Sequence, residues 1–385
     1  MLYRDDLVFP IEEFERRLYE LRQRMVEQEL DAMLTTTPEN ICYLTGFESP
    51  GHYYFNSLVV PLAGEPFMVP RKLEDSGVQA LTWIERSFPY ADHEVPMEKL
   101  AAVLKDHGLG GKRIGYEKNC WFFTATQQEQ LFDNCREAAF IDSSGIIEAG
   151  RLIKSEHEIA IMRKAAHATE AGMRAGVDAV QVGATENDVA AEIHHAMIKA
   201  GSEWPSIAPF VASGHRSAIG HATWMGRTIE ADEIIMIEIA GCVRRYHAPM
   251  MRTGFVGELD DDARKGEHIV QQAVQAMLDA IKPGVRARDA DAIGREIIAN
   301  SDFGGEQGSR SAYSVGIALP PDWGEGHILC LHPAEERLIE ENMTFHLLPW
   351  VQVPGKGGFS FSETIRVTKD GCEVLTDFPR QLFVR

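Results

Sequence analysis

The chain has 385 residues, of which 44% are hydrophobic and 25% are charged, a balance typical of a globular protein with more than one core. Its net charge of −20 argues against nucleic-acid binding, because phosphate contacts need a clustered basic surface. No run approaches the roughly 20 apolar residues that span a bilayer, and acids near the start replace the basic region of a secretory signal, so we expect a cytoplasmic protein without a membrane partner.

The first part of the chain, residues 1–150, is typical of an α/β domain. An amphipathic helix is predicted over residues 11–28, and short apolar strands are predicted over residues 32–34 and 58–61. Residues 51–55 form an aromatic cluster on a predicted loop.

The second part, residues 151–385, mixes long helices with antiparallel strands, which indicates an α+β class. Ser155 and Glu158 form a capping-box signal for a helix that runs towards residue 175. Further helices are predicted over residues 186–200 and 260–281. Strands are predicted over residues 233–240, 254–256, 343–348 and 362–368.

Two carboxylates stand in apolar strands of this second part. Glu238 interrupts a run of isoleucine and methionine, where an ionised carboxylate is costly unless it faces a polar site or a cation. A salt bridge to Arg252 or Arg310 is the alternative to a role in a binding site. Glu363 presents the same choice between facing the site and pairing with a neighbour.

The loop over residues 319–326 combines two prolines, two glycines, two acids and a tryptophan. Trp323 could cover a cationic ring while Asp322 or Glu325 accepts its N–H groups. A purely structural turn is the competing interpretation, and it would account for the prolines and glycines.

Several motifs in order along the chain carry a family resemblance. They are residues 40–47 (NICYLTGF), residues 151–155 (RLIKS), Ser213-Gly214 ahead of His221, and Arg252-Thr253. With them the chain resembles the creatinase, prolidase and aminopeptidase P family. The resemblance implies a catalytic pita-bread domain over residues 151–385, preceded by a smaller α/β creatinase-like N-terminal domain over residues 1–150.

Metal-dependent members of that family hold two metal ions with five ligands: two aspartates, a histidine and two glutamates. The resemblance places these five positions at Glu238, Pro249, Tyr313, Leu348 and Ser362. Only Glu238 remains a strong donor, whereas a divalent site needs several converging donors. The resemblance therefore implies a site without a metal ion or other cofactor. A residual Xaa-Pro metallopeptidase and a binding protein without activity are the alternatives.

Within the family, the chain resembles most the branch that hydrolyses ectoine, through residues 245–247, Tyr313-Ser314, the loop at 320–325 and Phe345-His346-Leu347. The resemblance implies a metal-independent hydrolase that opens the cyclic amidine of ectoine, or of hydroxyectoine, to N-acetyl-2,4-diaminobutyrate. A creatinase-like amidinohydrolase is a further alternative. Met251 and Leu348 stand where creatinase has glutamates, which argues against creatine itself.

This resemblance also implies roles for the candidate residues. Glu238 would attack the amidine carbon C2 or activate water, and His221 with His346 would move protons. Arg310 or Arg252 would hold the substrate carboxylate, and the Tyr313 hydroxyl would donate to the substrate or to a charged intermediate. The other expected substrate-binding residues are Asp322, Trp323, Glu325 and Glu363.

The partners expected are a zwitterionic small molecule, a second copy of the chain and a deacetylase that acts on the product. In creatinase-like dimers the first domain reaches over the neighbour's site. Tyr54 and Phe55 could therefore form a lid over the partner's site, although local packing explains the aromatic cluster equally well.

Overall fold

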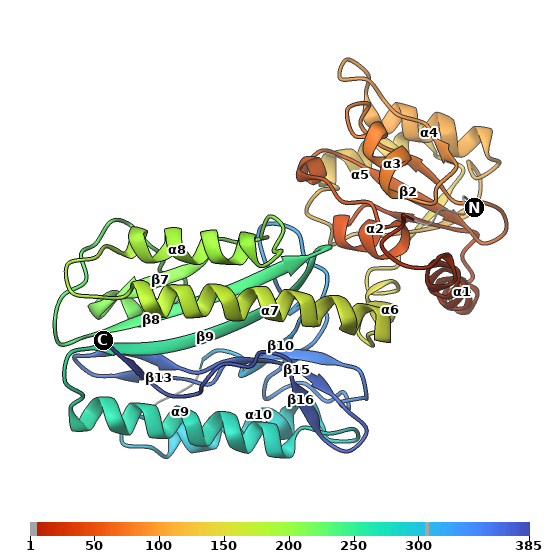
Figure 1. The fold of residues 1–385 in the computed structure, drawn as a ribbon. Coiled ribbons are helices and arrows are strands. Elements are labelled where there is room, and N and C mark those ends of the chain that lie inside the picture. Colours follow the sequence, from red (N-terminus) through yellow and green to blue (C-terminus); the bar gives the residue numbers. More distant parts are fainter. Residues whose placement is uncertain (1–5, 305–307) are drawn as a thin grey trace. The chain divides into compact units, whose positions relative to one another are not determined.

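The computed structural model describes residues 6–304 and 308–385 (Figure 1). The chain divides into two compact units between Arg151 and Leu152, one residue from the expected boundary. Residues 1–5 and 305–307 lie outside the described part.

The first unit is an α/β domain around a six-stranded sheet of order β4-β3-β2-β1-β5-β6. Its strands are β1 (Ala32–Thr35), β2 (Ser57–Pro61), β3 (Phe67–Val69), β4 (Arg86–Ser87), β5 (Arg113–Tyr116) and β6 (Ala139–Asp142). Its helices are α1 (Ile11–Glu27), α2 (Pro38–Thr45), α3 (Asp75–Leu81), α4 (Pro96–Asp106), α5 (Ala125–Asn134) and α6 (Glu148–Arg151), with a 3-10 turn η1 (Pro50–Tyr53). The predicted helix at 11–28 and both predicted strands are confirmed.

Three helices of the second unit begin within one residue of the predicted positions, and a fourth, α10 (Ala287–Ala299), was not predicted. The three are α7 (Glu156–Ala179), α8 (Glu186–Lys199) and α9 (Asp261–Ala280), and the unit also has a 3-10 turn η2 (Gly214–Ala218). The predicted capping box is confirmed, because the Ser155 hydroxyl accepts from the Glu158 amide and the Glu158 carboxylate accepts from the Ser155 amide. Within the described residues, no helix is both long and apolar enough to cross a membrane.

The strands of the second unit form two sheets and a hairpin. The first sheet, of order β17-β9-β8-β7, contains β7 (Phe210–Ser213), β8 (Glu233–Val243), β9 (Tyr246–Val256) and β17 (Phe383–Val384). The second, of order β11-β10-β12-β15-β16, contains β10 (Ala312–Ser314), β11 (Cys330–Leu331), β12 (Thr344–Leu347), β15 (Glu363–Val367) and β16 (Cys372–Val374). The hairpin pairs β13 (Trp350–Val353) with β14 (Gly357–Ser360). Strand β9 is much longer than the predicted 254–256.

The two sheets lie between two pairs of helices. In Figure 1, α7 and α8 run along one side of the strands and α9 and α10 along the other. Ile235, Ile237 and Ile239 of β8 share an apolar core with α7 and α8. Phe345 and Ile365 share another core with α9 and α10. The remaining faces of the two sheets are therefore turned towards each other.

Strand register decides which side chains reach this inner region. Glu238 pairs with Met251 and Ala240 with Pro249, whereas Ile237 pairs with Arg252. Directly paired residues share a face and neighbours along a strand alternate. Glu238 thus faces away from the α7/α8 core, towards the second sheet.

The opposing face of the second sheet carries Tyr313, His346 and Thr364, which are aligned across β10, β12 and β15. The Thr364 hydroxyl donates to the Pro249 carbonyl oxygen over 2.7 Å. This bond joins the two inner faces. The candidate site is built where they meet.

Candidate functional site

Glu238 is a buried carboxyl group without a partner in the protein. Its side chain is 8% exposed, and it makes no hydrogen bond or ion pair with any described residue. The salt bridges to Arg252 and Arg310 considered from the sequence are not formed. Burial, followed by the negative charge of Asp322, raises the pKa of Glu238 to about 8. The carboxyl group is therefore mostly neutral at pH 7 in the ligand-free protein.

An aromatic side chain on the neighbouring strand lies beside this carboxyl group. Phe210 is the cross-strand neighbour of Glu238 on β7 and lies on the same face. Its ring stacks on His221, with centroids 5.4 Å apart, and meets Trp323 edge-on at 5.3 Å. Phe210 was not predicted, because only strand register shows that it lies beside Glu238.

His221 is an exposed residue on the segment that follows β7, and its backbone adopts the left-handed conformation with φ of 62°. This segment is anchored by Glu186 at the start of α8. The wholly buried Glu186 carboxylate accepts from the Ser213 amide at 2.8 Å and from the Met225 amide at 3.2 Å, and it pairs with Arg216. Glu186 was also missed, because only the tertiary structure brings its carboxylate to the segment after β7.

A chain of hydrogen bonds runs through the inner face of the second sheet. The Trp323 indole N–H donates to the Tyr313 hydroxyl at 2.8 Å. His346 lies 2.9 Å from that hydroxyl through Nδ1 and 2.6 Å from the Ser362 hydroxyl through Nε2. Burial first, then the charges of Arg310 and Arg252, lower the pKa of His346 to about 3.

The prediction that His346 moves protons in catalysis is therefore corrected. Its ring is fully buried, and both of its nitrogens are occupied by protein hydroxyls. An imidazole with a pKa of about 3 stays neutral near pH 7 and does not take up a proton there. His346 belongs to the framework that holds Tyr313.

The side chains at the five family positions do not fit a dinuclear metal centre. Pro249 and Leu348 have no side-chain donor atom, and the Tyr313 and Ser362 hydroxyls are bonded to His346. Only the Glu238 carboxylate is left as a strong ligand. No group of three or more His, Cys, Asp or Glu side chains in the described part of the chain could hold a metal ion.

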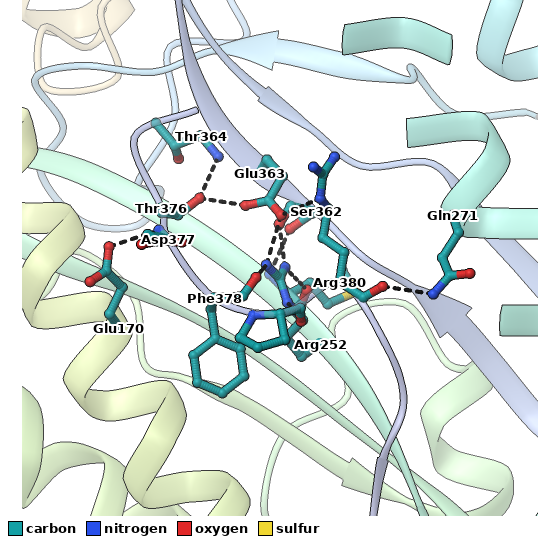
Figure 2. A network of polar contacts seen from close by, with 12 residues as sticks. Glu170, Arg252, Gln271, Ser362, Glu363, Thr364, Thr376, Asp377, Phe378 and Arg380 are labelled. Carbon is teal, nitrogen blue, oxygen red and sulfur yellow. Dashed lines mark hydrogen bonds and ion pairs between the residues drawn. The ribbon is translucent and has the colours of Figure 1, made fainter. Parts of the chain in front are cut away.

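Arg252 is a structural residue, as Figure 2 shows. Register places it on the face opposite Glu238, and its side chain is fully buried. Its five N–H donors are all used, by the carbonyl oxygens of Met251, Ser362, Phe378 and Pro379 and by the Glu363 carboxylate, at 2.7 to 2.9 Å. The prediction that Arg252 holds a substrate carboxylate is wrong.

Glu363 is the counterion of Arg252 and not a substrate ligand. One carboxylate oxygen accepts from Arg252 at 2.7 Å and the other from the Thr376 hydroxyl at 2.6 Å (Figure 2). Arg380 approaches the first oxygen to 3.6 Å. Of the two alternatives considered for Glu363, pairing with a neighbour is the one that the structure supports.

Arg310 remains available as an anion-binding residue. Its guanidinium lies over the Tyr313 ring, 4.2 Å from the centroid, and Nη1 donates to the Cys330 thiol at 3.2 Å. No carboxylate of residues 6–304 or 308–385 pairs with this half-buried cation. Arg310 is therefore the better of the two predicted carboxylate binders.

The loop at 319–326 was expected to present Asp322, Trp323 and Glu325 to a substrate, but only one of the three is exposed. Asp322 is exposed, but Trp323 is 3% and Glu325 only 1% exposed. The Glu325 carboxylate forms an ion pair of 2.6 Å with Lys154, which is equally buried. The predicted substrate-binding role of Glu325 is wrong, because its charge is already matched inside the protein.

The aromatic residues predicted as a lid have different environments. Phe55 is 4% exposed and packs with Tyr90 and Phe123 in the core of the first unit, so of the two alternatives considered for Phe55, local packing is the one that the structure supports. Tyr54 is 39% exposed, and its ring lies 3.9 Å from the Arg71 guanidinium. The role of Tyr54 over a partner's site stays a prediction.

Comparisons with known proteins agree with this architecture. Residues 160–369 match the model of metallopeptidase family M24, and residues 17–153 match the creatinase/prolidase N-terminal domain. An ectoine hydrolase of Halomonas elongata is 32% identical over 98% of this chain and 99% of its own length. A putative dipeptidase of Bacillus subtilis is 28% identical over 90% and 94%. The prolidase structure of Pyrococcus horikoshii shares the fold, with a TM-score of 0.84 at 24% identity, over 96% of this chain and all of that one.

Proposed function

The chain belongs to metallopeptidase family M24, with a creatinase/prolidase N-terminal domain and a pita-bread catalytic domain, and from this premise we propose that it is a metal-independent hydrolase that opens the cyclic amidine ring of ectoine. The full-length similarity to an ectoine hydrolase supports the substrate. The donor chemistry of the five family positions supports the absence of a metal-dependent step.

One observation carries the proposal: the buried Glu238 carboxyl group has no cationic partner among the described residues. An ionised carboxylate in such a position is strongly disfavoured until a cation arrives. A cyclic amidinium supplies that charge together with N–H groups for hydrogen bonds. Asp322, whose charge already influences Glu238, adds a second negative group for the same cation.

The other end of the substrate is an anion. Arg310 is a half-buried cation beside Tyr313 that pairs with no carboxylate among the described residues, and its guanidinium can bind a carboxylate through two parallel hydrogen bonds. Glu238 and Asp322 repel that end of the molecule. A zwitterion therefore binds in one orientation, with its amidinium at Glu238 and its carboxylate at Arg310.

In the proposed reaction one water molecule is consumed and one ring bond is broken. The Glu238 carboxylate attacks C2 or removes a proton from the water that attacks it, a C2–N bond breaks, and the departing nitrogen is protonated. The water oxygen ends in the acetyl group of N-acetyl-2,4-diaminobutyrate. His221 is the group placed to exchange protons with solvent, since its ring is exposed and held on Phe210.

The bound cation also prepares Glu238 for this step. A carboxyl group with a pKa of about 8 is mostly protonated at pH 7 and cannot act as a nucleophile or a base. An amidinium beside it favours the ionised form and lowers its pKa. Substrate binding would thus convert Glu238 to the ionised form that the reaction needs.

The test is an assay with metal-stripped protein on ectoine, hydroxyectoine, creatine and an Xaa-Pro dipeptide, with products identified by mass spectrometry. Ring opening of ectoine that persists with a chelator is the expected result. Cleavage of the dipeptide only after metal is added would establish a metallopeptidase instead. Binding without turnover of any compound would establish a binding protein.

The quaternary partners belong to the same proposal. A homodimer in which exposed Tyr54 approaches the neighbour's site, and a deacetylase that removes the acetyl group from the product, are the partners expected for this activity. Solution scattering of the wild-type protein tests whether it is a dimer. The kinetics of Tyr54→Ala, compared with those of the wild type, test whether Tyr54 contributes to the site. A monomer with full activity would rule out a lid from the neighbour.

A further inference from the structure

Two of the five family positions are joined through a histidine ring. Tyr313 and Ser362 both contact His346, at 2.9 Å and 2.6 Å. The Tyr313 oxygen also accepts from the Trp323 N–H at 2.8 Å, and the Ser362 oxygen accepts from the Met251 amide at 2.6 Å. Each hydroxyl oxygen therefore has two protein neighbours besides its own carbon atom.

Proton counting leaves one hydroxyl hydrogen without a partner in this chain. A neutral imidazole carries one N–H, so it donates to one hydroxyl and accepts from the other. If Nε2 carries the proton, His346 donates to Ser362 and accepts from Tyr313, and the Ser362 hydrogen is left over. If Nδ1 carries it, His346 donates to Tyr313 and accepts from Ser362, and the Tyr313 hydrogen is left over.

The surroundings distinguish these two tautomers. Ser362 is fully buried, and no acceptor other than His346 is found for its hydroxyl among the described residues. A buried hydroxyl without an acceptor is destabilising, because it loses the hydrogen bond that it makes with water. Tyr313 faces the region of Glu238, and Arg310 lies over its ring, so a ligand can accept its hydrogen. The Nδ1–H tautomer therefore places the unpaired proton where the proposed substrate binds.

We propose that His346, as its neutral Nδ1–H tautomer, positions the Tyr313 hydroxyl as a hydrogen-bond donor to the carboxylate group of the substrate. Both lone pairs of the Tyr313 oxygen are then filled, by Trp323 and His346, and its proton points in the one remaining direction. The identity of the substrate rests on the proposed function, whereas the tautomer does not.

The donor complements Arg310 at the anionic end of the substrate. An anion bound by the Arg310 guanidinium lies beside the Tyr313 ring, because the two groups are stacked at 4.2 Å. Burial and the charge of Glu238 raise the pKa of Tyr313 well above 10, so the phenol keeps its proton. Tyr313 and its support would thus select cyclic amidines that carry a carboxylate, and reject those that lack one.

The tautomer is tested by nitrogen-15 NMR of histidine-labelled full-length protein at pH 7, with the His346→Asn variant to assign the signal. The correlation pattern of an Nδ1–H imidazole is expected. An Nε2–H pattern would overturn the proposal, whatever the substrate proves to be.

The selectivity is tested with ectoine and with the same ring lacking the carboxylate, 2-methyltetrahydropyrimidine. Tyr313→Phe should lower kcat/KM for ectoine about 10- to 100-fold more than for the carboxylate-free amidine, chiefly through KM. His346→Leu should behave like Tyr313→Phe, and the double variant should be no worse than either. His346→Asn, which can still donate to Tyr313, should recover part of the activity.

The outcomes separate the two proposals. Equal losses on both amidines would overturn the positioning role, because a general defect of the site affects both substrates. Wild-type protein that opens neither ring would refute the proposed function, and the NMR result would still decide the tautomer.

Discussion

The replacement Glu238→Gln tests the central claim, that this carboxyl group is held in an environment unsuited to its charge. Its pKa is raised from 4.5 to about 8, chiefly by burial. At about 1.4 kcal/mol for each pH unit, this difference corresponds to at most about 5 kcal/mol of stability. The unfolded chain releases this proton near pH 4.5 and the folded chain only near pH 8, so stability is complete below pH 4.5 and is lost as the pH rises between the two values.

Glutamine keeps the shape of the side chain and cannot ionise. We therefore expect Glu238→Gln to be more stable than the wild type by about 1 kcal/mol or less at pH 5 and by about 3 kcal/mol at pH 7, and to approach the full difference at pH 9. Activity on ectoine should fall by about 100-fold or more, because the attacking or proton-accepting group is gone. The variant would be both more stable and inactive.

The assay is urea denaturation at pH 5, 7 and 9, run beside steady-state kinetics. Asp322→Asn is the matched control, because it removes the second cause of the raised pKa and should reduce the loss of stability with pH. The same pH dependence in wild type and Glu238→Gln would refute the reasoning. So would a glutamine variant with normal turnover.

Three further predictions follow from the site. Binding of a hydrolysis-resistant cyclic amidinium carboxylate at pH 7 should release close to one proton from Glu238, seen as calorimetric enthalpies that vary with buffer; identical enthalpies would contradict it. Arg310→Met should raise KM about 10- to 100-fold without loss of stability. Arg252→Met should instead lower the free energy of unfolding by about 3 to 5 kcal/mol, measured by thermal denaturation. The reverse pattern would show that Arg252, and not Arg310, binds the substrate. Lys154→Met should lower the free energy of unfolding by a similar amount, because it leaves the Glu325 charge buried and unpaired. Adding Glu325→Leu should restore most of that stability, and a double variant as unstable as Lys154→Met would contradict this explanation.

Local patterns predicted the four long helices α1, α7, α8 and α9. The capping box at Ser155 and Glu158 marks the start of α7, and amphipathic spacing locates α1 within one residue at its end. These features depend on residues three or four apart in the chain, so they can be seen without the fold. The length of β9 could not be seen, because polar residues such as His247, Arg252 and Thr253 are buried in it by contacts from other elements.

The site was predicted in part. Glu238 was found because a carboxylate in an apolar strand is anomalous wherever the strand lies. Arg252 and Glu325 were assigned to the substrate because a charge in a motif looks the same whether it faces a ligand or a counterion. Their partners, Glu363 and Lys154, are 111 and 171 residues away in the chain.

The sequence by itself determined the family, the starts of four long helices and the loss of four of the five metal-binding side chains, because each depends on the identity of residues at known positions. Only the tertiary structure decided which charges are already neutralised. A buried charge is stable only with a partner, and the partner is supplied by strand register and by the meeting of two sheets. That arrangement satisfied Arg252 and Glu325, and it left Glu238 and Arg310 to face a ligand.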